Sequence, residues 1–322
     1  MNNILCSIST RGRYYTTLPL ALEAIINQTK KPDKLIIYDD NDEPVDLRNE
    51  LYYHYFFQRL DIKGIKWEWV YAQKKGQHYN HQMANTAGYK WVWRIDDDCI
   101  PEPNVLETLY SYTNDNVGAV GGAILTPSHN FDTSKVTGKI ENIDVEANIQ
   151  WSEIKEQKEV EHLHCSFLYR AGIHDYNLGL SRVAHREETL FTYGLVQKGY
   201  KLLAVPNAIS WHLKNPQGGI RSETNHELYK SDEKIFRNLL NLKSNTIVVL
   251  NGGMGDHLVF NHVLPDIKNP IVFTCFPEIT PGRPVGEAIA LFGNIDQWSV
   301  YGKMIEWKWT DTLENAYRKM YV

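Results

Sequence analysis

The feature that most constrains the fold is an alternation of short apolar runs with segments of helical periodicity across the first hundred residues. Such alternation is typical of a mostly parallel sheet with helices on both faces. Two of the predicted strands, 34–38 and 90–95, end in the acids Asp39–Asp40 and Asp96–Asp98. Ligands of open α/β sheets bind beyond the carboxyl ends of the strands, so we expect both acid clusters to face one crevice.

The same patterns predict elements along the rest of the chain. The segment 126–160 is polar and lacks periodicity, and we expect an irregular insertion or lid there. Gly199 is a suitable C-terminal cap for a helix that begins near Glu187. We expect further strands at 4–9, 66–72, 117–125, 163–169, 202–205, 247–250 and 271–276, and helices at 18–29, 46–60, 79–89, 226–242 and 257–267.

The length of 322 residues predicts more than one domain. Residues 1–225 are expected to form the main α/β domain, and residues 226–244 a connecting helix. A strand, a glycine-rich turn, a helix and a second strand then make one βαβ unit. We therefore expect a small Rossmann-like α/β module at 245–322, with the boundary near Ser244.

Composition excludes several classes of protein. Hydrophobic residues at 43% and charged residues at 23% are typical of a globular chain. The net charge of −5 provides no overall field that attracts nucleic acid or anionic membrane. No run reaches the roughly 18 apolar residues of a membrane span, and the N-terminus lacks the pattern of a signal peptide. We expect no integral membrane segment and a cytoplasmic location, with reduced core cysteines at Cys6, Cys99, Cys165 and Cys275.

The acidic triplet Asp96–Asp98 is the strongest candidate for chemistry. Carboxylates a few ångströms apart repel, and a divalent cation is their natural partner. Mg²⁺ or Mn²⁺ takes one or two carboxylates and completes its shell with water and substrate phosphates. Alternation along a strand would put Asp96 and Asp98 on one side and Asp97 on the other. Taken alone, the triplet is equally consistent with a solvated acidic loop.

A series of short motifs follows these elements: Ser9–Arg13, Asn27–Thr29, Tyr38–Asp40, Ala87 before the strand that ends in Asp96–Asp98, Arg186–Leu190, Gly199–Lys201, Pro206 and Trp211–His212. In order and spacing they resemble glycosyltransferase family 2 over about residues 1–215. The resemblance implies a GT-A nucleotide-diphospho-sugar transferase fold with a mostly parallel central sheet, followed here by the small C-terminal module.

The resemblance implies inverting, metal-dependent transfer of a sugar from a nucleotide diphosphate to a hydroxyl acceptor. Asp39 matches the carboxylate that accepts a hydrogen bond from uracil, which favours a UDP-sugar as donor. The lack of a Gln/Arg-x-x-Arg-Trp motif after the acidic pair indicates a non-processive hexosyltransferase. The implied donor-binding residues are Thr10, Arg11, Asp39, Asp96 and Asp97, and the implied ligands of Mn²⁺ or Mg²⁺ are Asp98, Asp96 and His212.

Glu188 matches the catalytic base of the family, which deprotonates the acceptor hydroxyl. The family usually has Glu-Asp here, whereas this chain has Glu187–Glu188, so Glu187 is an alternative base. A third interpretation is that two acids in a first helical turn only complement the helix dipole.

Other histidines remain unassigned by the sequence. His162 and His164 alternate on one predicted strand beside Cys165, without a third metal ligand at suitable spacing. We expect them in the core or in an acceptor cleft. His78 and His81 lie near the position where the family contacts the nucleotide, without an exact match.

The predicted C-terminal module has a resemblance of its own. Val248–Asp256 is similar to the start of glycosyltransferase family 9, the heptosyltransferases. A glycine-rich turn of this kind lets backbone N–H groups approach an anion. From Val248 onward the resemblance has about 75 residues to cover, which is too few for a two-domain active site. We therefore expect a packing or acceptor-docking module or part of a longer bifunctional chain.

Two alternative functions remain open from sequence. One is a nucleotidyltransferase that makes a sugar nucleotide, although the expected glycine-rich basic loop after the first strand is reduced to one glycine. The other is a non-catalytic carbohydrate-binding or scaffold protein with a decayed site. For the transferase, the acceptor can be a glycan, a protein, a lipid-linked sugar or a modified nucleic-acid base.

Overall fold

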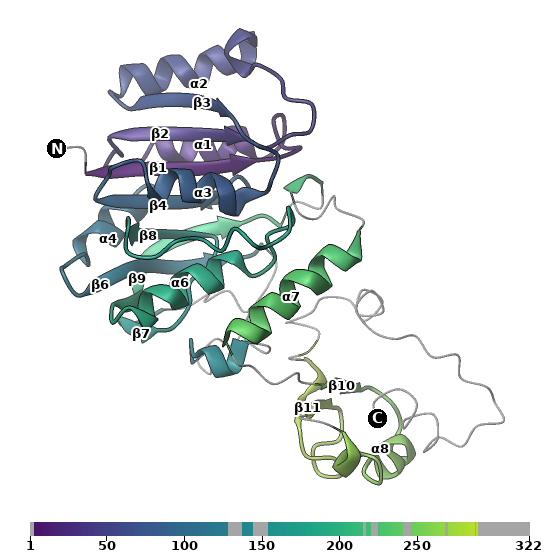
Figure 1. Cartoon of the computed structure of the whole chain (residues 1–322). Coiled ribbons are helices and arrows are strands. Elements are labelled where there is room, and N and C mark those ends of the chain that lie inside the picture. Colours follow the sequence, from purple (N-terminus) through teal and green to yellow (C-terminus); the bar gives the residue numbers. More distant parts are fainter. Residues whose placement is uncertain are drawn as a thin grey trace. The chain divides into compact units, whose positions relative to one another are not determined.

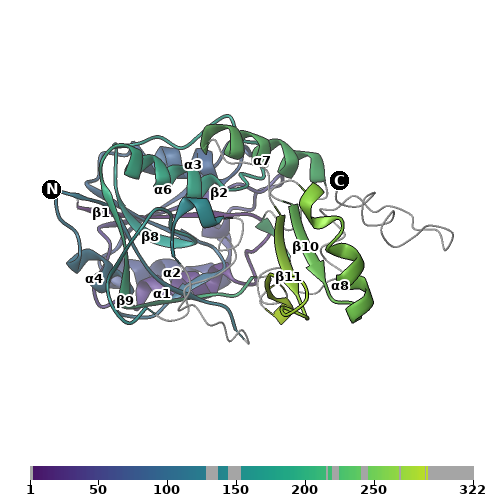
Figure 2. The ribbon, with the colours of Figure 1, turned by 90° about the horizontal axis from the view of Figure 1, so that it is seen from below.

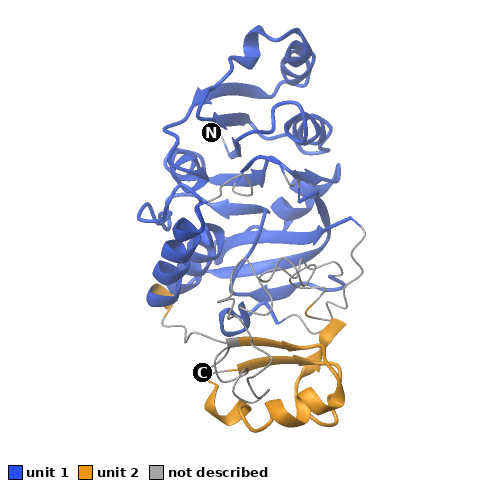
Figure 3. Cartoon of the chain, turned by 90° about the vertical axis from the view of Figure 1, so that its right-hand side faces the viewer, with its two compact units in different colours: residues 1–143, 150–238 blue, residues 144–149, 239–322 orange. Residues whose placement is uncertain are grey.

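The structure is a computed structural model. It describes residues 3–127, 137–143, 154–214, 217–219, 225–240, 246–267, 270–286 and 288. The chain divides into two compact units, the first drawn from residues 1–143 and 150–238 and the second, where it is described, from residue 239 onward (Figure 3). In the described part of the chain, no helix has both the length and the apolar character needed to cross a bilayer.

The first unit is built on one mixed sheet (Figure 1). Its strands are β1 (Ile4–Thr10), β2 (Lys34–Asp39), β3 (Lys66–Tyr71), β4 (Trp91–Asp96), β5 (Cys99–Pro101), β6 (Val117–Leu125), β7 (Lys158–Val160), β8 (Ser166–Arg170) and β9 (Lys201–His212). They lie in the order β3-β2-β1-β4-β8-β6-β9-β5, with β7 paired to β9. The four strands β1 to β4 are parallel neighbours, whereas β8 runs antiparallel to β4 and β6.

Helices cover both faces of this sheet, as the sequence predicts. Figure 2 shows α1, α2 and α4 on one side of the sheet and α3 and α6 on the other. Every residue of β1 is buried, because the strand is central and covered on both faces. The helices are α1 (Leu18–Ile26), α2 (Leu51–Ile62), α3 (Gln77–Asn85), α4 (Val105–Ser111), α6 (Glu187–Gln197) and α7 (His226–Leu240), with short 3₁₀ turns at η1 (Leu47–Asn49) and η3 (Ile140–Asn142).

The second unit contains a small parallel sheet of its own. Strands β10 (Thr246–Leu250), β11 (Pro270–Thr274) and β12 (Arg283–Pro284) lie in that order. Helix α8 (Met254–Phe260) and the 3₁₀ turn η5 (Leu264–Asp266) connect β10 to β11. A few buried apolar side chains form its core, among them Val248, Phe260, Val263 and Val272.

The strand register brings the two acid clusters to one edge of the first sheet. Thr10 at the end of β1 pairs with Asp39 of β2, and its neighbour Ser9 pairs with Asp96 of β4. The ends of three adjacent parallel strands therefore carry the two clusters on either side of β1. The prediction that both clusters lie at the carboxyl ends of neighbouring strands is confirmed, and one shared crevice stays a prediction.

Two of the predicted helices depart furthest from the observed bounds. The helix expected at 46–60 is divided into η1 and α2, because Glu50 has an extended backbone with φ −88° and ψ 118°. In the second unit, α8 begins three residues before the expected helix at 257–267 and ends at Phe260. In both places the helical periodicity predicted a helix that is present, but it did not predict the residues at which that helix begins and ends.

Among the strands, two predictions depart furthest from the observed bounds. The strand expected at 163–169 begins only at Ser166, because Cys165 has a positive φ of 55° that breaks the extended backbone. Strand β9 runs well beyond the expected 202–205, through Pro206. Its pairing with β6 is irregular across that proline, where Asn207 has a φ of 63°.

The segment expected to be irregular, 126–160, ends in a strand. Its last three residues form β7, which pairs with β9 in antiparallel fashion. Residues 128–136 and 144–153 of the predicted lid lie outside the described residues.

We expect Gly122→Ala to destabilise the first unit. A Cβ at Gly122 would lie 1.9 Å from the carbonyl oxygen of Ala208, where β6 and β9 meet. Relief of this overlap requires the backbone to move, so the free energy of unfolding should fall by about 1–3 kcal/mol. Urea denaturation followed by tryptophan fluorescence measures this change.

Gly255→Ala is the matched control, because no heavy atom lies within 4 Å of the Cβ it would add in helix α8. It should leave stability unchanged or raise it slightly. Equal stability of Gly122→Ala and the wild type would contradict the close β6–β9 approach.

Candidate active site

One buried arginine links the acidic triplet to the acids of helix α6. Arg94 Nη2 lies 3.0 Å from Asp96 Oδ1 and 2.5 Å from Glu187 Oε1. Its Nη1 donates to Glu188 Oε2. Three carboxylates thus share one guanidinium, whose rigid fork of donors suits such contacts. Because β4 carries Asp96 and α6 carries both glutamates, Arg94 holds these two parts of the site together.

The two glutamates differ in exposure and in charge. The Glu187 side chain is 1% exposed, whereas that of Glu188 is 21% exposed. Burial raises the pKa of Glu187 to about 8, although Arg94 opposes the rise. Burial acts in the same direction on Glu188, but Arg94 and His164 outweigh it and lower the pKa of Glu188 below its usual range. At neutral pH Glu188 is therefore the charged carboxylate that solvent reaches, and Glu187 holds a proton.

A second buried arginine holds the rest of the triplet. Arg13 Nη1 lies 2.5 Å from Asp97 Oδ1, and its Nη2 lies 3.2 Å from Asp98 Oδ2. Asp97 also accepts a hydrogen bond from Thr10 Oγ1 at 2.7 Å. The triplet is not one continuous strand as predicted, because β4 ends at Asp96. Arg13 contacts both later aspartates, and Asp98 lies beside His212, as Asp96 does. The guanidinium groups of Arg13 and Arg94 therefore neutralise part of the negative charge that the sequence alone assigns to a metal ion.

Asp39 ends β2 and is almost fully buried. Tyr14 donates its hydroxyl to Oδ2 at 2.6 Å, and Asn41 donates its backbone N–H and its side-chain amide to Oδ1 at 3.1 and 2.7 Å. A carboxylate accepts about four hydrogen bonds, and the residues that the structure describes fill three of these positions. Arg11, another predicted donor-binding residue, is paired with Asp42 at 2.8 Å.

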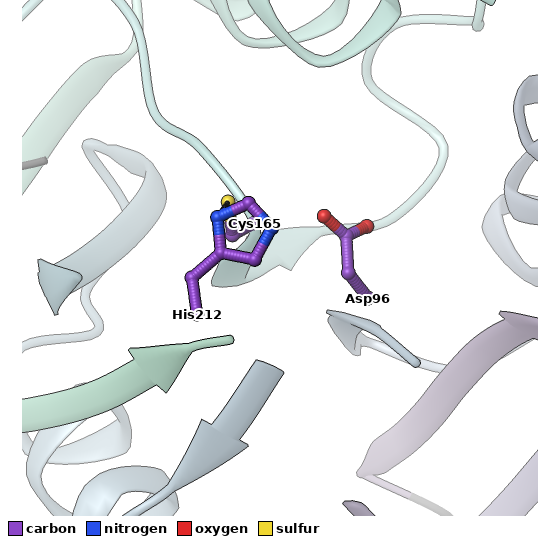
Figure 4. A group of neighbouring side chains, drawn as sticks. All are labelled: Asp96, Cys165 and His212. Carbon is purple, nitrogen blue, oxygen red and sulfur yellow. Dashed lines mark hydrogen bonds between the residues drawn. The ribbon is translucent and has the colours of Figure 1, made fainter. Parts of the chain in front are cut away.

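A carboxylate, a thiol and an imidazole come together beside the triplet (Figure 4). Ligand atoms of Asp96, Cys165 and His212 lie within 4.8 Å of one another. The His212 Nε2 atom lies 3.4 Å from Asp98 Oδ1. The predicted metal ligands therefore meet at one imidazole, with Cys165 as an unpredicted neighbour. This mixture of oxygen, nitrogen and sulfur donors fits a divalent transition metal.

Cys165 is buried, as expected of a core cysteine, but it lies in the site. Its backbone N–H donates to Glu188 Oε2 at 3.0 Å, and its carbonyl accepts from the Asp96 N–H at 3.1 Å. Burial raises the pKa of its thiol. For Cys275 the expectation of a core position is wrong, because this free cysteine is exposed in the second unit.

The predicted placement of His162 and His164 on a strand is wrong, since both precede β8. His162 Nδ1 lies 3.0 Å from His164 Nε2, and His164 Nδ1 lies 3.4 Å from Glu188 Oε1. The two imidazoles thus extend the site beyond Glu188. His78 and His81 on α3 are fully buried.

Helix α7 fixes the loop that precedes the two glutamates. The buried Asp232 accepts hydrogen bonds from the Ser181 backbone N–H at 2.6 Å, the Ser181 hydroxyl at 2.9 Å and the His185 N–H at 2.9 Å. The loop then reaches α6 through Arg186, whose φ of 67° is rare for a residue with a side chain. The positions of Glu187 and Glu188 therefore depend on a helix that the sequence identified only as a connection.

Several functional neighbours were missed by sequence reasoning. Arg94 had a usable signal, because a charge inside the apolar run Trp91–Ile95 must find buried partners. Arg13 lies within the Ser9–Arg13 motif but received no role. Cys165 and Asp232 had no local signal, since their partners are distant in the sequence.

The chain is similar to known glycosyltransferases. A sequence model of the family described as "Glycosyl transferase family 2" matches residues 7–176, more than half of the chain. No curated protein matches the chain.

The solved structures that resemble the chain share its fold at low sequence identity. S. aureus TarS 1-349 in complex with UDP-GlcNAc is 13% identical, with a TM-score of 0.52, and the match covers 75% of this chain and 68% of that one. For S. aureus TarS the identity is 12%, the TM-score 0.50, and the coverage 92% and 47%. For GalNAc-T7 with UDP, GalNAc and Mn²⁺ the identity is 15%, the TM-score 0.49, and the coverage 66% and 44%. The chain thus spans less than half the length of the last two. The similarity to the TarS structures shows the GT-A fold expected for this chain.

We expect the stability of the first unit to depend on pH through Glu187. The folded chain holds the Glu187 proton up to about pH 8, whereas the unfolded chain loses it near the usual carboxyl pKa. Between these values the folded state binds more protons, so this contribution to stability falls as pH rises. Glu187→Gln imitates the protonated side chain. It should match the wild type at about pH 5 and exceed it by on the order of 1–3 kcal/mol at about pH 9.

Urea denaturation at the two pH values measures the effect. Glu188→Gln is the control of opposite sign, because it removes a charge that Arg94 stabilises and should lower stability at about pH 9. If Glu187→Gln had the same stability as the wild type at both pH values, Glu187 would not carry a raised pKa.

Proposed function

Because the chain belongs to glycosyl transferase family 2, we propose that it transfers a sugar from a nucleotide diphosphate, with UDP as the nucleotide, to a hydroxyl acceptor with inversion of configuration. The observation that carries this proposal is the Arg94 contact with both Asp96 and Glu188. It brings the donor-binding end of the sheet next to a charged, solvent-reachable carboxylate. A donor and an acceptor bound at this edge would meet between these two carboxylates.

The donor nucleotide is proposed to bind beyond the ends of β1, β2 and β4. The remaining acceptor position of Asp39 suits the imide N–H of uracil, and Tyr14 and Asn41 fix the orientation of this carboxylate. Arg11, which directly follows β1, offers positive charge to a diphosphate. Thr10 and Asp97 bond to each other, so we assign them to shaping the β1 end rather than to direct nucleotide contact. TarS, which shares the fold, has been solved with UDP-GlcNAc, and this supports a UDP-sugar.

A divalent ion is proposed at the imidazole of His212. The donor set fits such an ion, because Asp96, His212 and Asp98 present carboxylate and imidazole atoms to one another. When bound, an ion such as Mn²⁺ or Mg²⁺ would offset the charge that develops on the departing nucleotide diphosphate. These residues would hold the ion at the end of β4, and its positive charge would attract the diphosphate.

Glu188 is proposed as the general base and Glu187 as a positioning residue. Glu188 is charged and accessible, so it can accept the proton of the acceptor hydroxyl as the oxygen attacks the anomeric carbon. Its contact with Arg94 lowers its basicity but fixes its direction. Glu187 is buried and protonated, and it shares Arg94 with Glu188. We propose a non-processive hexosyltransferase, with a glycan, a protein, a lipid-linked sugar or a nucleic-acid base as the acceptor classes to test.

The first prediction concerns donor binding. Calorimetric titration of UDP and GDP, each with Mn²⁺ and with EDTA, should show metal-dependent binding of UDP and weaker binding of GDP. Asp98→Asn keeps the shape of the side chain but removes its charge, and it should weaken the Mn²⁺-dependent binding by about 10–100-fold.

Asp115→Asn is the control for this titration, because Asp115 is 95% exposed and paired only at the surface with Arg170. It should bind UDP as the wild type does. Absence of nucleotide binding under all conditions would overturn the transferase proposal and favour the scaffold protein.

The second prediction separates the two glutamates. Release of UDP from UDP-GlcNAc, with water or added glycans as acceptors, should fall by about 10²–10⁴-fold in Glu188→Gln. Glu187→Gln should stay within about tenfold of the wild type, because it imitates a side chain that is already protonated. UDP binding should be unchanged in both variants. A larger loss in Glu187→Gln than in Glu188→Gln would reverse the assignment.

A further inference from the structure

Cys165 has a constrained backbone conformation at the centre of the site. Its φ of 55° is uncommon for a residue with a side chain. Both of its backbone polar groups bond to the site, the N–H to Glu188 and the carbonyl to the Asp96 N–H. Strained backbone of this kind is concentrated at ligand-binding positions. The result is a thiol that faces His212, with Sγ 3.4 Å from Nδ1 (Figure 4).

The distance from sulfur to nitrogen is the one expected for two ligands of a single ion. A Zn–S bond of about 2.3 Å and a Zn–N bond of about 2.0–2.1 Å at a tetrahedral angle put the two atoms about 3.5 Å apart. Asp96 supplies a carboxylate oxygen, and one ligand atom from each of Asp96, Cys165 and His212 lies within 4.8 Å of the other two. The other nitrogen of His212 faces Asp98 at 3.4 Å, and a carboxylate in that position orients metal-bound imidazoles in many proteins.

We propose that Cys165 binds the ion as a thiolate, together with His212 and Asp96, and that its sulfur makes the site select zinc-class ions over Mg²⁺. This inference rests on the part of the proposed function that assigns an ion to this site. It changes the role of Asp98 from a direct ligand to a residue that orients His212.

The selectivity follows from the chemistry of the donors. Thiolate favours zinc and cobalt, whereas Mg²⁺ prefers an octahedral shell of oxygen atoms and releases water reluctantly. On binding, the S–H bond of Cys165 breaks, the electron pair stays on sulfur and forms the bond to the ion, and the proton passes to solvent. The positive charge of the ion favours this loss of the proton even in a buried position.

Cobalt(II) is the probe, because sulfur ligation gives it an intense near-ultraviolet charge-transfer band. The full chain should carry Cys275→Ser in every titration. The exposed Cys275 thiol lies 3.6 Å from His257 Nε2 and could bind cobalt by itself. In this background we expect the charge-transfer band together with the strong visible absorption of a four-coordinate ion. Zinc should displace the cobalt, and Mg²⁺ in the same excess should not.

Addition of Cys165→Ser to this background should abolish the band and weaken cobalt affinity by at least about 10-fold. Circular dichroism checks that the double variant is folded. If cobalt bound to the Cys275→Ser variant without producing the band, Cys165 would not be a ligand, and the proposed ion site would remain. A band that persists in the double variant would also overturn the role of Cys165 as a ligand. If cobalt did not bind at all, the inference would fail. The UDP titrations would still test the proposed transferase function independently.

Discussion

The contact of Arg94 with three carboxylates is the interaction on which the site depends. A fully buried guanidinium is costly to remove from water unless its charge is matched and its donors are satisfied. Here Asp96, Glu187 and Glu188 match the charge from two separate elements through the two Nη atoms of Arg94. The excess of negative charge is relieved because Glu187 retains its proton. Arg94 lowers the pKa of both glutamates, and Glu188 carries the charge because His164 and the Cys165 N–H lower its pKa further.

The surrounding structure maintains this arrangement from both sides. At the sheet, Arg13 binds Asp97 and Asp98 and so ties the turn after β4 to the end of β1. At helix α6, Asp232 of α7 holds the preceding loop through backbone and hydroxyl donors. Most of these groups are buried, where unpaired polar atoms would be expensive. The site is thus a connected polar network in which each charged residue restricts the side-chain positions of its neighbours.

The fold could be predicted in outline because its signals are local. Apolar runs and helical periodicity identified the order of elements, and the acids after β2 and β4 identified the functional edge of the sheet. Errors occurred where the backbone changes direction for non-local reasons. Cys165 ends the expected strand early because its backbone bonds to Asp96 and Glu188, and β9 continues past Pro206 because β6 and β5 pair with it on either side of the irregularity.

The sequence by itself determined the fold class, the family resemblance and the acids that define the site, since these depend on residue type and spacing. Only the tertiary structure decided the charge of each acid. Glu187 and Glu188 are adjacent and chemically identical in the sequence, yet their pKa values shift in opposite directions. Burial dominates at Glu187, whereas His164 and the Cys165 N–H add to the effect of Arg94 at Glu188. Likewise the sequence shows Cys165 only as one more apolar residue, and its contact with His212 exists only in the folded chain. Burial and proximity are properties of three-dimensional packing, and these two properties divide the roles within the site.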